Sequence, residues 1–447
     1  MSVIRITPSL MLLLAACAPN NGSSSTPLTR ITPIAAESQR LGGDPARGYT
    51  ALVNEGYVSL GIPWTAFSAA MTPLQERDSL PGRSGDNARV GYSFNVATNQ
   101  YGMKIASPNC LSCHAKHLNG ALVVGLGRAA HGPAIPSGTA TDAFSIDLAL
   151  RSPDELKAFS QWGTHLLGAL EAGAASSFGA LAAHRDPGTL AWSDTLRFDP
   201  STPVKGWIDV PPWWRAKKKN GLYYNGAGRG DQVRHMMNMS VVSLVDVAEA
   251  ERVDAMFLDI AAFIHSIVPP RFSSPLDAAR VAQGERVFVE NCARCHGTYG
   301  ANESYPNLLI PADEVGTDPS LANDFWANKD AARWFGESFF GQSGARYEAV
   351  VGYLAPPLDG VWATAPFFHN GSVPTLAAVL DSSSRPTRWS MSFEDADFDA
   401  DAVGWKTDGV GELYDTTQPG SSNAGHTFAD GLSTDERRAL LEYLKTL

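Results

Sequence analysis

The sequence has few basic residues and, after its N-terminal region, no long apolar run. Its 35 Lys and Arg are outnumbered by 46 Asp and Glu, which gives a formal net charge of -11. Because nucleic-acid binding requires a basic surface, we expect no nucleic-acid partner. The most apolar later stretch, residues 241–268, is interrupted by charged residues, so we expect a soluble body without a transmembrane helix. Hydrophobic residues still make up 44% of the chain, enough for a packed core.

Cysteine is also scarce, with only five residues. The first, Cys17, follows a layout typical of a secretory signal, in which Arg5 precedes the short apolar run 10–16. The end of this run resembles the bacterial lipoprotein signal, whose Cys becomes the lipidated first residue; an ordinary cleaved signal is the alternative. We predict residues 1–17 as signal peptide and lipid-attachment Cys, and residues 18–45 as a flexible tether. The protein would then be exported, and its lipid anchor alone would hold it at the periplasmic face of a membrane. The outer membrane and the cell surface are both compatible with this prediction.

The other four cysteines form two Cys-x-x-Cys-His motifs, at residues 110–114 and 292–296. Two thiols one helical turn apart reach the vinyl groups on one edge of a porphyrin, and the following His binds the iron beneath the ring. A redox dithiol would not need the His, and a zinc site would gather four ligands in a short segment. The motifs therefore predict two covalently bound haem c groups, attached and ligated by Cys110, Cys113 and His114 and by Cys292, Cys295 and His296.

Helical patterns surround both motifs and suggest two similar domains. Asp277 is a suitable N-cap for a helix that leads into the second motif, and Ser433 with Glu436 forms a capping box before the last helix. Apolar residues at helical spacing over 253–267 end at a Pro-Pro pair and close the first half in the same way. We predict a mostly α fold with long loops and little sheet, made of two cytochrome c-like haem domains, residues 46–270 and residues 276–447.

Several segments resemble one family of bacterial haem proteins. Residues 357–376, which include Ala-Pro-Phe-Phe-His-Asn-Gly, are similar to the bacterial dihaem cytochrome c peroxidases and their relatives, MauG and the dihaem rubber oxygenases. Residues 421–428, 109–127 and 209–231 look closest to the rubber-oxygenase branch. The resemblance implies that the N-terminal haem is the reactive one.

The resemblance also implies a set of axial and neighbouring residues. His426 matches the second ligand of the C-terminal haem, with Met391 as the alternative and a loop histidine as the structural interpretation. His131 lies at a distance past the first motif where peroxidase-like relatives place a removable distal His, so it is a candidate distal ligand or acid–base group; a loop histidine is again the alternative. His369 belongs to a specific motif, and we expect it to have a supporting or structural role rather than to bind iron.

Aromatic residues in the first half match a region that lies near or between the haems of that family. Trp213 and Trp214 could relay electrons or form a wall of an oxygen pocket, and ordinary core packing is the equal alternative. Tyr223 and Tyr224 are weaker candidates for the lining of that pocket.

Two charged clusters receive plainer interpretations. Arg215 with the lysines at 217–219 is expected to form a solvated face, with contacts to haem propionates or to a partner as the alternative. The family often carries calcium between its domains, and an acidic cluster could bind it, although the spacing does not match an EF-hand loop; its members are Glu394, Asp395, Asp397, Asp399 and Asp401.

These patterns predict an exported dihaem oxidoreductase of the peroxidase or oxygenase type. The first haem, bound by His114, would activate peroxide or dioxygen, and the second, bound by His296 and His426, would transfer electrons. The expected partners are a small-molecule oxidant and a periplasmic protein that donates or accepts electrons. The alternatives are a non-catalytic periplasmic electron carrier with two six-coordinate haems and an accessory or sensor lipoprotein whose haems are structural.

Overall fold

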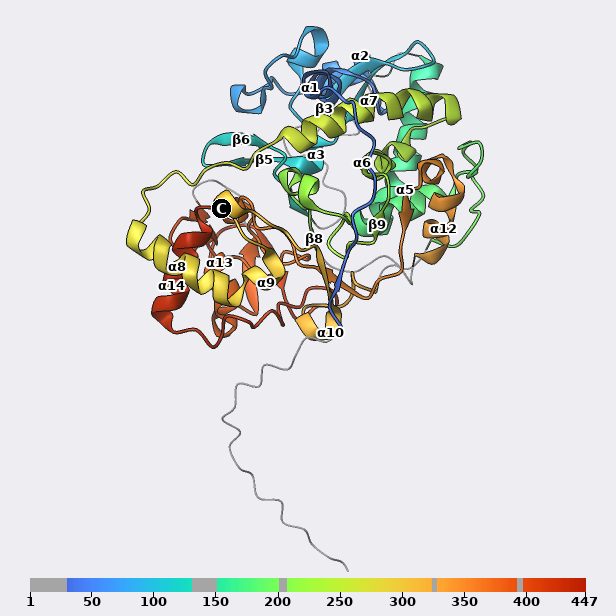
Figure 1. Cartoon of the computed structure of the whole chain (residues 1–447). Helices are drawn as coiled ribbons and strands as arrows, with labels where there is room; N and C mark the ends of the chain where they lie inside the picture. Colours follow the sequence, from blue (N-terminus) through green and yellow to red (C-terminus); the bar gives the residue numbers. More distant parts are fainter. Residues whose placement is uncertain (1–29, 131–149, 151, 201–206, 324–327, 392–396) are drawn as a thin grey trace, which may run out of the picture.

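The computed structural model describes residues 30–130, 150, 152–200, 207–323, 328–391 and 397–447 (Figure 1). The helices of the first half are α1 (Pro45–Asn54), α2 (Trp64–Ala70), α3 (Leu111–His114), α5 (Pro153–Ala183), α6 (Gln232–Met236) and α7 (Val247–Ser266). Those of the second half are α8 (Ala278–Asn291), α9 (Ala293–His296), α10 (Ala312–Val315), α12 (Lys329–Glu337), α13 (Leu376–Leu380) and α14 (Thr434–Leu444). None of these described helices is long and apolar enough to span a bilayer.

Short strands form small antiparallel sheets around the helices, so the fold is mixed and the expectation of a mostly α fold with little sheet is too simple. The first-half strands are β2 (Ile62–Pro63), β3 (Phe94–Thr98), β4 (Lys104–Pro108), β5 (Ala115–Leu118), β6 (Ala121–Val124), β7 (Ala129–Ala130), β8 (Ile208–Asp209) and β9 (Gly228–Arg229). The others are β1 (Thr32–Pro33), β10 (Leu308–Pro311), β11 (Arg346–Tyr347), β12 (Gly352–Leu354), β13 (Arg388–Met391), β14 (Phe398–Asp399), β15 (Gly404–Trp405) and β16 (Glu412–Asp415). The longest strands, β3 and β4, pair as an antiparallel hairpin between α2 and the first motif.

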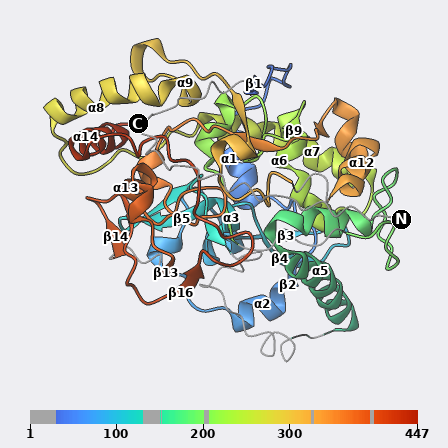
Figure 2. The ribbon, with the colours of Figure 1, turned by 90° about the horizontal axis from the view of Figure 1, so that it is seen from below.

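In each half, a helix that precedes the Cys-x-x-Cys-His motif packs against the helix that closes the half. α1 packs on α7, and α8 packs on α14; the second pair lies side by side in both views (Figures 1 and 2). The crossing of α8 and α14 is so close that a Cβ on Gly284 would lie 1.9 Å from the Ala439 carbonyl oxygen. Only glycine permits this approach, so the sequence itself fixes where these two helices cross.

The helix ends confirm the capping predictions. The Asp277 side chain accepts hydrogen bonds from the first backbone N–H groups of α8, and Ser433 with Glu436 forms the predicted capping box of α14. The helix expected over 253–267 is present as α7 but begins earlier, because Asp246 caps its first turn through the N–H of Glu249.

The segment from Arg30 to Asp44, which the sequence analysis assigned to a flexible tether, is bound to the body of the protein. Its strand β1 pairs with β10 in the second half, and Glu37 forms an ion pair with Arg346. Arg40 then pairs with Asp254 of α7 in the first half at 2.7 Å. The described part of this segment therefore crosses both halves before α1 begins.

Each of the two hydrophobic cores contains side chains from the other half of the sequence. Trp334 and Phe335 of α12, which belongs to the second half of the chain, pack into the core of the first half beside Phe178 of α5. Figure 1 shows α12 next to α5. Conversely, Leu118 and Trp214 of the first half lie in the core of the second. The halves are thus interlocked by packing.

Candidate haem sites

Both Cys-x-x-Cys-His motifs form the same single helical turn. In α3, the N–H of His114 donates to the Cys110 carbonyl at 3.1 Å, and the Cys110 N–H donates to the Tyr57 hydroxyl at 3.1 Å. In α9, the N–H of His296 donates to the Cys292 carbonyl at 3.0 Å. All four motif cysteines are free thiols, as thioether attachment to a porphyrin requires.

The imidazole of each motif lies beside the carbonyl of a Pro-Pro pair. His296 Nδ1 is 2.8 Å from the Pro356 carbonyl oxygen, so Nδ1 carries the proton and Nε2 keeps its lone pair for a metal. The carbonyl of Pro211 lies near His114 in the same way, although without a hydrogen bond of standard geometry. Burial lowers the pKa of His114 to about 3 and also lowers the pKa of His296, so both imidazoles are neutral at pH 7, the form that binds a metal.

The two Pro-Pro pairs belong to an internal repeat that the sequence analysis missed. Residues 209–228 and 354–373 align without a gap, and each copy carries Pro-Pro near its start and Asn-Gly near its end. A backbone hydrogen bond closes both loops, between residues 222 and 228 at 2.9 Å and between residues 367 and 373 at 2.7 Å. The next residue has a positive φ in both copies: 66° at Tyr223 and 70° at Phe368. The equal spacing of Pro-Pro and Asn-Gly is a signal that the sequence alone displays.

The two copies of the repeat contact each other through equivalent residues. The N–H of Asp209 donates to the His369 carbonyl at 2.9 Å, and the N–H of Leu354 donates to the Tyr224 carbonyl at 2.8 Å. Asp209 is equivalent to Leu354, and Tyr224 is equivalent to His369, so the two bonds are the same bond made twice. This reciprocity is the pattern of a two-fold interface. His369 therefore has a structural place at this interface, where its Nε2 lies 3.1 Å from the Tyr353 hydroxyl.

Ionisable groups are buried along this interface. The Tyr224 hydroxyl donates to the Asp209 carboxylate at 2.6 Å, and the Lys116 ammonium donates to the Ala365 carbonyl at 2.9 Å. Burial raises the pKa of Asp209 and lowers the pKa of Lys116. These polar contacts fix the register of the two halves, because a shift would leave buried charges without partners.

His426 lies opposite His296, as the sequence analysis expected of a second iron ligand. The two ring centroids are 6.2 Å apart, and His426 Nδ1 is buried without a protein partner. Two imidazoles that each bind one metal at about 2 Å would place their centroids roughly 6 Å apart. Burial and the neighbouring His296 lower the pKa of His426 to about 4, which keeps it neutral. The pair fits a porphyrin iron between its rings.

Trp213 and Trp214 take different sides of the interface. Both begin the 3-10 turn η3 (Trp213–Lys218), and both are buried. The Trp213 ring stacks on His114 with centroids 4.6 Å apart. The Trp214 indole N–H donates to the Asp359 carbonyl at 2.8 Å, three residues after the proline that bonds to His296. Adjacent tryptophans thus contact the surroundings of both motif histidines.

The basic cluster after these tryptophans is not the solvated face that we expected. Arg215 and Lys219 are both only 7% exposed, and Arg215 Nε donates to the Asp359 carbonyl at 3.0 Å. Lys218 bridges Asp359 and Glu303, each at 2.6 Å. The segment is drawn into the interface because the second half supplies these acceptors, and Arg215 adds to burial in lowering the pKa of His296.

Several predicted site residues receive no support from the described structure. His131, Cys17, Glu394 and Asp395 lie outside the described residues, and the side chain of Met391 does also. Asp399 uses its carboxylate to accept two backbone N–H groups of its own turn. Within the described parts of the chain, no three His, Cys, Asp or Glu side chains form a group that could hold a metal ion, so nothing there supports the calcium site.

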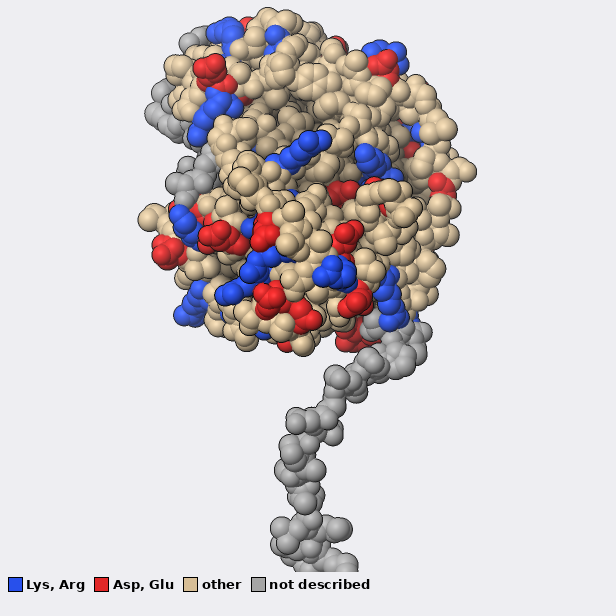
Figure 3. All heavy atoms as spheres, turned by 60° about the vertical axis from the view of Figure 1, so that its left-hand side comes forward, with Lys and Arg blue, Asp and Glu red and all other residues tan. Residues whose placement is uncertain are grey.

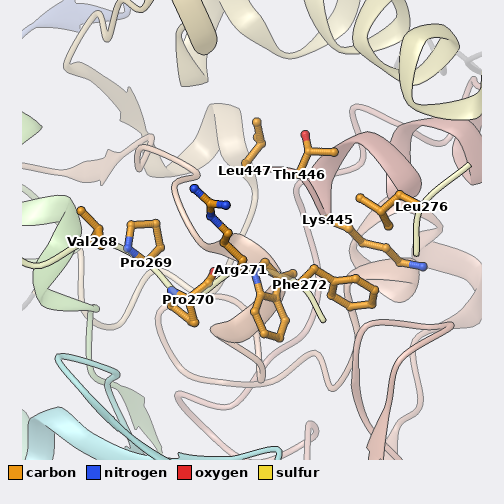
Figure 4. A pocket seen from close by; sticks show the side chains of 10 residues that line it. Val268, Pro269, Pro270, Arg271, Phe272, Leu276, Lys445, Thr446 and Leu447 are labelled. Atoms are coloured by element: carbon orange, nitrogen blue, oxygen red, sulfur yellow. Dashed lines mark hydrogen bonds between the residues drawn. The ribbon is translucent and has the colours of Figure 1, made fainter. Parts of the chain in front are cut away.

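A cleft of about 610 Å³ lies at the connection between α7 and α8, and no motif residue lines it (Figure 4). It is lined by Val268, Pro269, Pro270, Arg271, Phe272, Leu276, Trp362, Lys445, Thr446 and Leu447. Figure 3 shows one face of the molecule, on which acidic and basic side chains are intermixed. Neither feature brings together groups that could carry out chemistry.

Two Cys-x-x-Cys-His turns, each next to a crossing pair of helices, define a cytochrome c-like haem protein. The sequence profile described as RoxA-like, cytochrome c-like matches residues 352–390, which include the second copy of the repeat. The profile described as cytochrome C oxidase, cbb3-type, subunit III matches residues 279–349, which include the second motif. Both matches imply covalently bound haem c and a redox role.

Two uncharacterised proteins of Sinorhizobium fredii are similar in sequence. The protein y4iJ is 33% identical over 40% of this chain and 41% of its own length. The protein y4iM is 27% identical over 53% of this chain and 64% of its own length. The chain therefore spans less than two thirds of either relative.

Proposed function

We propose that this protein is an exported dihaem oxidoreductase with unlike haem centres. His296 and His426 would hold the second haem, which would supply electron storage and delivery. His114 would hold the first haem, which would supply a binding place for peroxide or dioxygen. The observation that carries the proposal is the pair of neutral, buried imidazoles with centroids 6.2 Å apart at the second motif.

Bound haem iron supplies one-electron redox chemistry and, where one axial face is free, binds a small oxidant. The protein's part is to hold and connect the two centres. The carbonyl of Pro356 fixes the orientation and tautomer of His296. Trp213 stacks on His114, and its neighbour Trp214 bonds to the Asp359 carbonyl, so contacts continue from one proximal histidine toward the other. This continuity supports electron exchange between the centres.

The test is spectroscopy of the native, haem-loaded full chain. Low-temperature electron paramagnetic resonance should show one low-spin centre with two histidine ligands and a second centre whose spectrum changes when peroxide or cyanide is added. Two low-spin centres whose spectra do not change with either reagent would contradict an oxidant site. They would favour the second candidate, a periplasmic electron carrier, which the two-histidine geometry at the second motif also supports.

The proposed location has a separate test. Export as a lipoprotein predicts that the mature chain begins at a lipidated Cys17, without residues 1–16. Intact-mass analysis of membrane-extracted protein would show two haem additions and a lipid addition. A soluble mature chain with an unmodified N-terminus would contradict the anchor but not the haem centres.

A further inference from the structure

Arg385 connects the backbone around His426 to helix α13. We use the name His426 loop for residues 420–427. Arg385 is half-buried between this loop and α13, and all its hydrogen bonds go to backbone carbonyls. The acceptors and distances are Ala378 (3.0 Å), Val379 (3.3 Å), Asn423 (2.8 Å), Gly425 (2.6 Å) and His426 itself (3.2 Å).

The first part of the His426 loop is held by other side chains: Asn370 donates to the carbonyls of Gly420 at 3.2 Å and Ser422 at 3.0 Å, and the Asp318 carboxylate accepts from the Ser422 N–H at 3.2 Å. Arg385 holds the part that carries His426. Residues 421–427 contain no helix or strand. His426 has a φ of 46°, in the left-handed region that a residue with a Cβ occupies rarely. One backbone bond, from the His426 N–H to the Val315 carbonyl at 2.7 Å, fixes the loop on one side. The carbonyls of Asn423, Gly425 and His426 turn the other way, toward Arg385.

Arg385 also supports the ring that packs against the ligand. Its guanidinium carbon lies 5.1 Å from the centre of the Phe368 ring, and the Phe368 and His426 ring centroids are 5.9 Å apart. Hydrogen bonds from a charged donor are about twice as strong as neutral ones, and a guanidinium presents its five N–H groups in a fixed plane. A single side chain therefore fixes the backbone of His426 and one neighbour of its imidazole.

We propose that Arg385 is the positioning residue that keeps His426 directed at His296, and so sets the second axial ligand of the C-terminal haem. This inference rests on the proposed function, since it requires that His426 binds the iron. Removal of Arg385 should release His426 from its place opposite His296 and so remove the second ligand of this centre.

The experiment compares three variants of the haem-loaded full chain. In Arg385→Gln, we expect the low-spin signal of the second centre to be lost and to return on addition of free imidazole, which needs no positioning. Arg385→Lys keeps the charge but can reach fewer carbonyls, so it should retain part of the signal. The matched control, Arg388→Gln, removes an exposed arginine three residues away whose ion-pair partner in the described structure is Asp415, and it should leave the spectrum unchanged.

The outcomes separate this inference from the proposed function. If Arg385→Gln keeps the low-spin signal of the unaltered protein, the positioning role is wrong while the two-histidine centre stands. If the unaltered protein shows no two-histidine centre, the proposed function itself fails.

A second comparison covers the case in which Arg385→Gln loads haem poorly. His426→Gly supplemented with imidazole has a free ligand in place of the loop histidine. In that background, Arg385→Gln should no longer change the spin state, because there is no ligand left to position. A further loss of low-spin signal despite saturating imidazole would show a general structural role and overturn the proposal.

Discussion

At the scale of single residues, the three histidines that we propose as haem ligands have distinct environments. His296 is fixed by a carbonyl hydrogen bond, His426 by contacts to its backbone, and His114 by the stacked Trp213. All three are neutral because burial lowers their pKa values. The two motifs point to His114 and His296, and the family resemblance points to His426; the structure adds that the His426 ring lies opposite His296.

The first prediction concerns the second axial ligand. His426→Ala should convert the second centre from low spin to a five-coordinate high-spin state that binds cyanide, and should leave the first centre unchanged. Visible and electron paramagnetic resonance spectra of the oxidised protein measure this. His184→Ala is the control, since His184 stacks on Trp192 and bonds to the Ser193 carbonyl, and neither partner belongs to a motif. An unchanged low-spin spectrum in His426→Ala would assign the ligand to another residue.

The second prediction concerns acid stability. Burial lowers the pKa of His235 to about 4, below the roughly 6.5 of an unfolded His, so the unfolded chain binds its proton first. This contribution to stability is present above about pH 6.5 and is lost as the pH falls toward 4, by up to roughly 3 kcal/mol. His235→Gln should therefore show a smaller loss of unfolding free energy between pH 7 and pH 4.5. Denaturant unfolding at both pH values measures the difference; equal losses in the two proteins would contradict it.

At the scale of elements, each half is organised by two crossing helices and a repeated loop. The crossing helices pack against each other, and the loop presents a proline carbonyl near the motif histidine. The capping residues and apolar periods of these helices could be read from the sequence. The loop repeat could also have been recognised in the sequence. The contact between its two copies could not, because the copies are far apart in the chain.

The third prediction tests the helix crossing. Gly284→Ala places a methyl group 1.9 Å from the Ala439 carbonyl oxygen, so α8 and α14 must move apart. We expect a loss of about 2 kcal/mol or more in unfolding free energy, as for other overpacked cores. Gly163→Ala in α5 is the control: nothing lies within 4 Å of its added Cβ, and the change should be neutral or slightly stabilising. Equal stability of both variants would show that the helices adjust without cost.

At the scale of the whole molecule, the interface between the halves lies between the surroundings of the two motif histidines. It is built from reciprocal backbone bonds, buried charges and the Trp213–Trp214 pair. Exchange of core segments, such as α12 packing against α5, prevents the halves from moving independently. A fixed distance between centres is what efficient electron exchange requires.

The fourth prediction tests this connection. Trp213→Leu keeps an apolar side chain beside His114 but removes the aromatic ring, so electron transfer between the centres should slow several-fold while both oxidised spectra stay the same. Rapid-mixing reduction, followed at wavelengths that distinguish the two centres, gives the rate. Trp192→Leu, which removes a tryptophan away from the interface, is the control. An unchanged rate would indicate that electrons follow another route.

The sequence by itself determined what depends on neighbours along the chain. Two five-residue motifs specify covalent haem attachment, Asp277 and Ser433 specify helix starts, and the net charge of -11 describes the surface. Only the tertiary structure decided that Trp213 meets His114 and that Arg215 meets the acceptors that bury it. The pairing of His426 with His296 was expected from the family resemblance, and the structure supplied its geometry. The reason is physical, because short-range geometry fixes a turn or a cap, whereas the partner of a side chain across the molecule depends on the packing of the whole chain.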